Sequence, residues 1–392
     1  MSRASRRRLL VALNYYAPYV SGVTEVARIV AEGLSARGWD VTVVASRHDE
    51  ALPEQDTING VRVVRTPVVA RIGKGVISPT FVPTVARWAR LADAVHVHLP
   101  MLEAGAIALA TRHRPLVATY HCDVSLPPGA ENTLQVRALD ASHRVALRLA
   151  AAAVVTSADY AGASRLGDAL SRNQVVIPPP CLLRDGGAPV FRDGDGLHVG
   201  FLGRIVEEKG LEYLVDGFRA RNDDAARLLI AGDFSNVAGG SVVEKVRQHI
   251  GGDPRVRLLG FLPDEQISDF FASLDVFALP SVNSLEAFGI VQAEAMMLGV
   301  PVIAADRPGV RTVVATTGFG RLVPPRNAAA ITTALDTVER DHWDTERSAA
   351  RARELYGAAS VIDRYESTLT RLTASKPFPG RRLASGQCKP HP

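Results

Sequence analysis

One short segment constrains the fold more than any other, residues 276–303, with the sequence VFALPSVNSLEAFGIVQAEAMMLGVPVI. Its first four residues are apolar, which is typical of a strand buried on both faces of a parallel sheet. A polar turn follows over residues 281–285. Apolar side chains then recur at helical spacing until a Gly-Val-Pro stop, at Phe288, Ile290, Val291, Ala295 and Leu298. We therefore predict a strand, a turn, a helix over residues 287–298 and a second strand at 302–304.

Two carboxylates, Glu286 and Glu294, lie near the start of this predicted helix. Glu286 is at the turn and Glu294 about two turns into the helix, which separates them by on the order of 10 Å along the axis at roughly 1.5 Å per residue. The acid and nucleophile of a glycosidase lie about 5 to 9 Å apart. The spacing favours two separate hydrogen-bond acceptors that hold different hydroxyls of one extended ligand, over a catalytic pair or a plain solvated helix face.

Strand and helix patterns alternate along the rest of the chain, which is typical of parallel sheets built from βαβ units. The alternation breaks at a stretch rich in Pro, Gly and Asp over residues 178–196 and then restarts. A chain of 392 residues is also too long for one compact core. We predict an α/β protein in which two Rossmann-like parallel-sheet domains face each other across a cleft that binds the ligand.

The expected domain boundaries follow from this break. Residues 1–188 form the N-terminal domain and residues 189–356 the C-terminal domain. A terminal helix over residues 357–374 is expected to pack back toward the N-terminal domain. Residues 375–392 lack periodicity, and we expect them to be disordered.

Charge is distributed unevenly between the two halves. Residues 1–185 carry 21 Lys and Arg against 15 Asp and Glu, whereas residues 186–392 carry 24 against 26. A basic half suits an anionic partner, such as a phosphorylated acceptor or a membrane surface. The alternative is that the excess belongs to an N-terminus expected to be mobile, through Arg3, Arg6, Arg7 and Arg8. Arg137, Arg144 and Arg148 share one face of a predicted helix. This face either contacts lipid phosphates or is simply solvated, and both interpretations are open.

The cysteines and the length of the apolar runs indicate the cellular compartment of the protein. Three scattered cysteines with no metal-binding spacing predict a reducing environment. No apolar run reaches the 18 or so residues needed to span a bilayer, and the five-residue run that starts at Leu9 is shorter than the core of a secretory signal. We expect a cytoplasmic protein, with a peripheral contact at the inner face of the membrane left open, and no nucleic-acid partner.

Several loops that follow predicted strands carry candidate binding residues. Arg204 and Lys209 lie in GFLGRIVEEKG, residues 200–210, where an arginine fork and a mobile ammonium can hold a diphosphate. Gly22 lies near the start of a predicted helix, whose backbone amides and dipole favour a phosphate. The loop around Gly22 lacks the fingerprints of the usual dinucleotide and ATP sites. Phe261, in GFLPDEQ, could line a nucleobase pocket together with backbone groups.

Three histidines lie at the ends of predicted strands. His121, in VATYHCDV, is placed to hydrogen-bond a sugar hydroxyl or carbonyl, although a core histidine satisfied by the backbone is an open alternative. His96 and His98 alternate along one strand and should face the same side. Asp123 is a conceivable third metal ligand, but the spacing of these residues does not match a known metal site. We therefore predict no metal. Cys122 is interpreted as a small apolar neighbour rather than a nucleophile.

At these residues the chain resembles the retaining glycosyltransferases of the GT-B fold known as family four, or glycosyl transferases group 1. The resemblance covers about residues 9–370 and rests on four motifs in the same order. EAFGIVQAEAMMLGVPVI is similar to the Glu-x7-Glu motif of that family, GRIVEEKG to its phosphate-binding loop, and ATYHCD to the segment with its active-site histidine. YAPYVSGVTEVARIVAEGLSARGWDVTVV is similar to its N-terminal loop and first helix, although many relatives have Gly-Gly where this chain has Ser21 and Gly22.

The resemblance implies roles for the matching positions. The N-terminal domain would bind the acceptor and the C-terminal domain the nucleotide-sugar donor. His121, Arg204, Lys209 and Glu286 would form the catalytic set, with Glu286 on the transferred sugar. Contacts to the rest of the donor would come from Gly22, Gly203, Phe261, Leu262, Phe288, Gly289, Ile290 and Glu294, the last of these on the ribose.

These expectations combine into one hypothesis about the reaction. The chain would move a hexose of the mannose, glucose or N-acetylglucosamine type from a nucleotide-diphosphate sugar to an acceptor hydroxyl, without a cofactor or a divalent metal. The acceptor would be a glycan, a lipid-linked molecule or a small molecule. Two alternatives are open: a GT-B nucleotide-sugar epimerase and a non-catalytic nucleotide-sugar binding protein.

Overall fold

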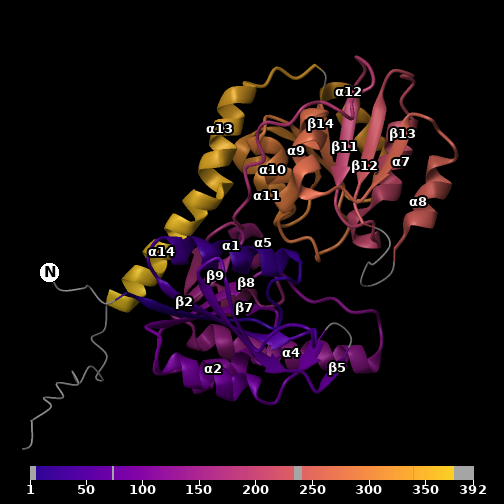
Figure 1. Ribbon diagram of the computed structural model, residues 1–392. Helices are drawn as coiled ribbons and strands as arrows, with labels where there is room; N and C mark the ends of the chain where they lie inside the picture. Colours follow the sequence, from indigo (N-terminus) through magenta and orange to yellow (C-terminus); the bar gives the residue numbers. More distant parts are fainter. Residues whose placement is uncertain (1–5, 73–74, 234–240, 339, 375–392) are drawn as a thin grey trace, which may run out of the picture.

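The computed structural model describes residues 6–72, 75–233, 241–338 and 340–374. Within these residues the chain forms two parallel sheets, each flanked by helices, which lie one above the other in Figure 1. The prediction of an α/β protein with two Rossmann-like domains is confirmed. The tail expected to be disordered, residues 375–392, lies outside the described residues.

The N-terminal sheet has eight strands in the order β10-β9-β8-β7-β1-β2-β4-β3, of which β3 is antiparallel to β4. Its strands are β1 (Arg8–Ala12), β2 (Asp40–Arg47), β3 (Gln55–Ile58), β4 (Val61–Pro67), β7 (Ala94–Leu99), β8 (Leu116–Tyr120), β9 (Ala152–Val155) and β10 (Gln174–Val176), and a separate hairpin is formed by β5 (Ala70–Ile72) and β6 (Gly75–Ile77). Its helices are α1 (Gly22–Ala36), α2 (Phe81–Ala89), α3 (Ala104–Ala110), α4 (Ala130–Leu149), α5 (Ala158–Ala163) and α6 (Gly167–Leu170). Because successive strand residues point to opposite faces, Leu10 packs with α2 and α3, whereas Leu9 and Val11 pack with α1.

The C-terminal sheet has six parallel strands in the order β13-β12-β11-β14-β15-β16. They are β11 (His198–Leu202), β12 (Arg227–Ala231), β13 (Val256–Gly260), β14 (Val276–Leu279), β15 (Val302–Ala305) and β16 (Gly320–Val323). The helices are α7 (Leu211–Arg219), α8 (Val243–Ile250), α9 (Asp264–Ala272), α10 (Ile290–Met297), α11 (Val310–Thr317), α12 (Ala328–Val338) and α13 (Thr345–Tyr356). One apolar cluster runs through this domain and includes fully buried Phe201, Phe277 and Phe319.

The last helix, α14 (Ala358–Ala374), leaves the C-terminal domain and lies against α1 of the N-terminal domain (Figure 1). Val361, Ile362 and Tyr365 are buried in the same cluster as the α1 side chains. The approach is close, since a Cβ on Gly33 of α1 would lie 2.3 Å from a methyl carbon of Ile362. At the crossing point, the amide of Cys181 donates to the carbonyl of Tyr356, so the two connections between the domains are hydrogen-bonded to each other.

Two sequence-based expectations about elements were wrong, and other elements were not expected. The helix that contains Glu294 begins at Ile290 rather than 287, because Gly289 takes a left-handed conformation (φ 79°) that ends the preceding loop. The apolar spacing of residues 160–170 predicts one helix, but the structure divides this stretch into α5 and α6 at Ser164, which is extended and accepts a hydrogen bond from the amide of Leu166. Strands β3, β5, β6 and β16 and helix α11 were not expected.

The N-terminal arginines also differ from the expectation of a mobile terminus. Arg8 starts β1, and the guanidinium of Arg7 lies 5.5 Å from the ring centroid of Trp39 and donates to Thr370 of α14. Arg3 lies outside the described residues. None of the helices in the described residues has the length and apolarity to cross a membrane.

Candidate active site

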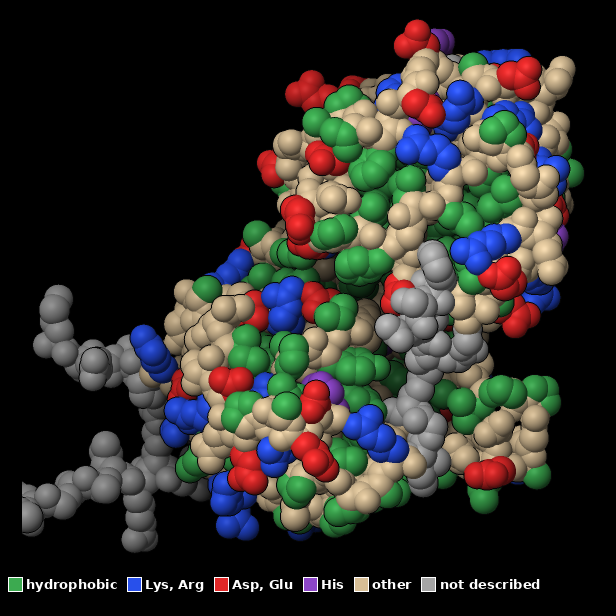
Figure 2. All heavy atoms as spheres, turned by 45° about the vertical axis from the view of Figure 1, so that its right-hand side comes forward, with side chains coloured by type: hydrophobic (Ala, Val, Ile, Leu, Met, Phe, Trp, Pro, Cys, Tyr) green, Lys and Arg blue, Asp and Glu red, His purple; other side chains and the backbone are tan. Residues whose placement is uncertain are grey.

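The predicted site residues gather at the carboxyl ends of the strands in both domains, which is where open α/β sheets bind ligands. His121 follows β8, Gly203 and Arg204 follow β11, and Phe261 follows β13. Figure 2 shows the surface hollowed between the two domains. The strand-end loops of one domain therefore face those of the other.

A salt bridge between Lys209 and Glu286 joins two of these loops. The loop after β11 is held against the loop after β14, because the amide of Val282 donates to the carbonyl of Glu208. Gly210 makes this contact possible: it has a φ of 63°, and a Cβ there would lie 2.6 Å from the carbonyl oxygen of Pro280. Both charged side chains are mostly buried, with 13% of Lys209 and 15% of Glu286 exposed.

The N-terminus of α10 lies immediately after Glu286 and has no side-chain cap, because its N-cap is Gly289. The amides of its first turn therefore carry the positive end of the helix dipole without a capping oxygen, an arrangement that suits a phosphate or a sugar hydroxyl. Phe288 cannot contribute its ring to such a ligand. Its side chain is 3% exposed and packs edge-on against Tyr356, so only its backbone is left for binding.

Glu294 lies on the first turns of α10 and is 6% exposed. Its Oε1 accepts from the amide of Leu182 at 3.4 Å, and its Oε2 lies 3.7 Å from Nε of Arg184. Burial raises the pKa of Glu294 to about 7, against the opposing effect of Arg184. The two motif glutamates thus lie in different surroundings: Glu286 is ion-paired in a loop, and Glu294 is buried against the connection between the domains.

The remaining residues predicted for the donor site in the C-terminal domain differ in exposure. Arg204 is 52% exposed and pairs with Glu208 at 3.3 Å, so its guanidinium can turn to a ligand at little cost. Phe261 is 72% exposed, a large apolar ring in solvent directly after β13, whereas Leu262 is 7% exposed and belongs to the core. Of the residues predicted for the donor site, Lys209 and Glu286 are joined by a salt bridge.

Helix α1 begins at Gly22, and Ser21 is its N-cap. Ser21 forms a capping box with Thr24, in which each side chain accepts a hydrogen bond from the backbone amide of the other. This local role explains the serine at this position. A Cβ on Gly22 would meet no atom within 4 Å, so the space in front of this helix turn is open.

His121 follows the end of β8 directly and is 8% exposed. Burial, followed by the charges of Asp123 and Glu286, raises the pKa of Cys122 to about 12. The hydroxyl of Tyr160, which accepts from the amide of Asp123, donates to the carbonyl of Ser284 at 3.1 Å. Ala287 packs in the core cluster of the N-terminal domain together with Tyr120. The histidine segment and the glutamate loop therefore meet at the domain interface.

The same region shows what Asp123 does. Its carboxylate accepts from the hydroxyls of Tyr120 (2.5 Å) and Ser164 (2.9 Å), and its amide donates to Tyr160. These contacts tie the end of β8 to α5. Among the described residues there is no group of three or more His, Cys, Asp or Glu side chains arranged to hold a metal ion.

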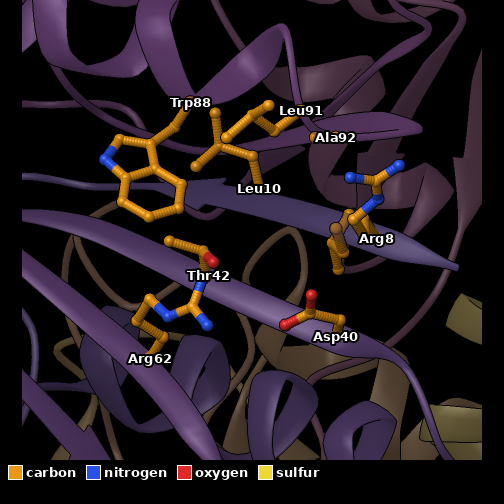
Figure 3. A pocket seen from close by; sticks show the side chains of 9 residues that line it. Arg8, Leu10, Asp40, Thr42, Arg62, Trp88, Leu91 and Ala92 are labelled. Atoms are coloured by element: carbon orange, nitrogen blue, oxygen red, sulfur yellow. The ribbon is translucent and has the colours of Figure 1, made fainter. Parts of the chain in front are cut away.

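A small pocket of about 80 Å³ lies at the other end of the N-terminal sheet (Figure 3). It is lined by Arg8 and Asp40, which begin β1 and β2, and by Trp88, over which Arg62 lies at 5.5 Å. These are the amino ends of the strands. The pocket is thus remote from the strand ends that carry the site.

Sequence reasoning missed three contacts of the site. Arg184 approaches Glu294 from the connection between domains, where its charge drew no notice in a Pro- and Gly-rich stretch. His98 is hydrogen-bonded to His121, with Nδ1 of His98 and Nε2 of His121 2.9 Å apart. Asp159 of α5 joins the domains by accepting from Arg311 at 2.7 Å and from the amide of Gly309 at 2.9 Å.

Comparison with known proteins places this geometry in a family. The profile described as "Glycosyl transferases group 1" matches residues 189–355, and the "Glycosyl transferase 4-like domain" profile matches residues 21–180. The 2-deoxystreptamine glucosyltransferase of Streptomyces kanamyceticus is 30% identical over 65% of this chain and 70% of that protein. The chain belongs to the glycosyl transferases group 1 family. The resemblance drawn from the four motifs is confirmed.

Other relatives of this glycosyltransferase support the same family. A phosphatidyl-myo-inositol mannosyltransferase of Mycobacterium leprae is 28% identical over 88% of this chain and 89% of that protein. Among solved structures, the sucrose-phosphate synthase of Thermosynechococcus elongatus matches with a TM-score of 0.76 at 20% identity, over 95% of this chain and 100% of that one. Anabaena Alr3699/HepE in complex with UDP-glucose matches with a TM-score of 0.67 at 21% identity, over 93% of this chain and 99% of that one. These likenesses confirm the GT-B fold.

Proposed function

We propose that this glycosyltransferase moves a hexose from a nucleotide-diphosphate sugar to an acceptor hydroxyl and retains the anomeric configuration. The observation that carries the proposal is the Lys209–Glu286 pair beside the uncapped N-terminus of α10. A cation, a carboxylate and free backbone amides then lie within one loop cluster. They match a diphosphate that must be neutralised and a sugar whose hydroxyls must be held.

The proposed chemistry needs no covalent partner from the protein. The bond between the anomeric carbon and the diphosphate oxygen breaks, and negative charge develops on the leaving diphosphate. Arg204, Lys209 and the α10 amides stabilise that charge as a preorganised set of donors. The acceptor oxygen bonds to the anomeric carbon on the same face, and its proton passes to the leaving phosphate. Glu286 and His121 hold the sugar, and Glu294 holds the ribose hydroxyls.

The proposal includes metal independence, because Arg204 and Lys209 supply the positive charge that a divalent cation supplies elsewhere. Activity measured after dialysis against EDTA is expected to match that of the untreated enzyme. Complete loss that magnesium restores would overturn this part of the proposal.

For the acceptor we propose a cyclitol ring. Relatives are named for phosphatidyl-myo-inositol, D-inositol 3-phosphate and 2-deoxystreptamine, all of which contain a hydroxylated six-membered carbocycle. In this chain the rings of Tyr15 and Tyr19 stack at 4.5 Å beside His48, near the carboxyl ends of β1 and β2. An aromatic surface there offers the C–H face of such a ring an apolar contact.

The test is a matrix of donors and acceptors. UDP-glucose, UDP-N-acetylglucosamine and GDP-mannose are each incubated with myo-inositol, an inositol phosphate and 2-deoxystreptamine, and products are detected by mass spectrometry. Lys209→Ala should lower turnover by about two to three orders of magnitude. An epimer formed from donor alone would establish the epimerase alternative, and donor binding with no conversion under any pairing would establish the binding-protein alternative.

A cytoplasmic location with a peripheral contact at the inner membrane face is part of the proposal. The exposed side of α4 carries Leu134, Arg137 and Arg148, a pattern that suits an anionic surface. Co-sedimentation with anionic vesicles is expected, and it should be lost when both arginines are replaced by glutamine. Absence of binding to anionic vesicles would contradict the contact.

A further inference from the structure

Beneath His121, a group of buried polar side chains occupies neighbouring strands of the N-terminal sheet. His96 and His98 lie on β7, and Thr119 and His121 lie on and just after β8. His96, His98 and Thr119 are 0%, 1% and 3% exposed. The prediction that the two β7 histidines face the same side is confirmed, since their ring centroids lie 4.2 Å apart.

The hydrogen bonds of this group run in two opposite directions. His98 contacts His121, Nδ1 to Nε2 at 2.9 Å, and the two ring planes differ by 17°, as they do when two imidazoles meet edge to edge. His96 instead contacts Thr119, Nε2 to Oγ1 at 2.7 Å, and Thr119 contacts the hydroxyl of Tyr365 on α14 at 3.2 Å. His98 and His96 are neighbours on one face of β7, but their hydrogen bonds form two separate branches. The His98 branch leads to the active site, and the His96 branch leads away from it to α14.

The rings of the His98–His121 pair are neutral near pH 7. Burial lowers the pKa of His121 to about 4 and that of His98 well below its usual range. One proton therefore occupies the bond between them. In the first arrangement the proton is on Nδ1 of His98, and Nε2 of His98 is then an unprotonated acceptor. In the second arrangement the proton is on Nε2 of His121, and His98 then carries its own proton on Nε2.

The surroundings of His98 favour the first arrangement. Its Nε2 is fully buried and has no hydrogen-bond partner among the described residues. A buried N–H without an acceptor is rarer in native structures than an acceptor left unsatisfied. His98 is then the donor to His121. Because Nε2 of His121 accepts, the proton of His121 lies on Nδ1, at the ring edge that His98 does not cover.

We propose that His98 is a positioning residue, which donates Nδ1–H to Nε2 of His121 and so fixes His121 as the tautomer that presents an Nδ1–H donor to the sugar or to the leaving diphosphate. The kinetic part of this inference rests on the proposed function. The hydrogen bond made by one ring nitrogen decides which form the other nitrogen takes. A His121 free to exchange tautomers would present a lone pair to hydroxyl or phosphate oxygens for part of the time.

The first test needs no substrate. Full-length protein labelled with 15N-histidine is examined by NMR without ligand, and the His121 signals are identified by their loss in His121→Asn. In the wild type the proton of His121 is expected on Nδ1. His98→Leu should release it to a mixture of tautomers, whereas His98→Asn, whose amide nitrogen can replace Nδ1, should keep it on Nδ1. A His121 proton on Nε2 in the wild type, or a tautomer unchanged in His98→Leu, would overturn the proposal.

The second test compares adjacent histidines by steady-state kinetics. His98→Leu is expected to lower kcat about 10- to 100-fold with a small change in donor KM, the range found when partners that orient metal-binding histidines are removed. His98→Asn should restore kcat to within about threefold of wild type. His96→Leu is the matched control, because it removes an equally buried ring from the other branch and should keep kcat within about threefold.

Unfolding by urea is measured on the same variants. If His96→Leu and His98→Leu lose stability and kcat to the same extent, the role of His98 is structural and the proposal is overturned. If the wild type transfers no sugar in any donor and acceptor pairing, the proposed function fails, and the NMR result still decides the tautomer of His121.

Discussion

Lys209 and Glu286 are joined by a salt bridge across two strand-end loops, although they lie 77 residues apart in sequence. Both have a second task in the proposed reaction, Lys209 on the diphosphate and Glu286 on the sugar. Donor binding must therefore exchange an internal ion pair for contacts with the ligand.

Glu286→Gln is expected to separate the two tasks. Without the carboxylate, Lys209 is free before the ligand arrives, so a nucleoside diphosphate that lacks the sugar should bind more tightly, by about 1 kcal/mol or roughly fivefold in Kd. Turnover of the complete donor should fall, because the sugar hydroxyls lose the charged carboxylate that accepts their hydrogen bonds and keep only a neutral amide oxygen. Isothermal titration with UDP and GDP measures the first effect and an initial-rate assay the second. Weaker nucleoside diphosphate binding in Glu286→Gln would show that Lys209 does not bind the phosphates.

Gly22→Ala tests the N-terminal half of the donor site without disturbing the fold. A Cβ at this position meets nothing within 4 Å, and the residue opens a helix, where alanine is favourable. The thermal midpoint should therefore stay the same or rise slightly. If the diphosphate packs against this turn when the domains close, the added methyl group will raise the donor KM by about tenfold or more. An unchanged KM would remove Gly22 from the site.

Gly210→Ala is the contrasting variant. It places a side chain at a φ of 63° and within 2.6 Å of both Pro280 and Val282. Strain and overpacking together should lower the free energy of unfolding by about 2 to 4 kcal/mol. Urea denaturation measures this loss, and a wild-type midpoint would contradict the close packing of the two loops.

The burial of Glu294 predicts a pH dependence of stability. The pKa of this carboxyl is raised from 4.5 to about 7 in the folded chain, so the native state holds the proton more tightly than the unfolded state. Its favourable contribution is complete below pH 4.5 and is lost as the pH rises through 7, a change of on the order of 3 kcal/mol. Glu294→Gln should therefore be more stable than wild type at pH 8, with the difference shrinking toward pH 5. Urea unfolding of both proteins at pH 5, 6, 7 and 8 measures this difference. If the free energy of unfolding depended on pH in the same way in both proteins, the buried state of Glu294 would be contradicted.

Helices and strands could be predicted from the sequence where their apolar residues form a continuous run or recur at helical spacing. β8, β14, α7 and α12 have the bounds that their apolar spacing indicates. β16 was missed because Arg321 and Leu322 in its centre are exposed, so the strand shows no apolar run. The positions of Lys209 and Glu286 in strand-end loops could be predicted, because each follows a buried apolar strand in the sequence, whereas their roles at the site remain a prediction. Contacts made by the folded chain were not found: Leu182 meets Glu294 across 112 residues, and His98 meets His121 through the pairing of β7 with β8.

Asp159 is expected to control how far the two domains open. Its carboxylate binds Arg311 through two nitrogens, at 2.7 and 3.0 Å, and also accepts from the amide of Gly309. Asp159→Asn removes the charge and weakens these bonds, so the open form should gain population. Small-angle scattering should then show a larger radius of gyration without donor, and the donor KM should rise several-fold while kcat changes little, because closure must precede chemistry. Asp306→Asn is the matched control, since Asp306 pairs with the same Arg311 at 3.1 Å from within the C-terminal domain and should leave both quantities unchanged. Equal effects of the two substitutions would assign the change to Arg311 itself rather than to the link between the domains.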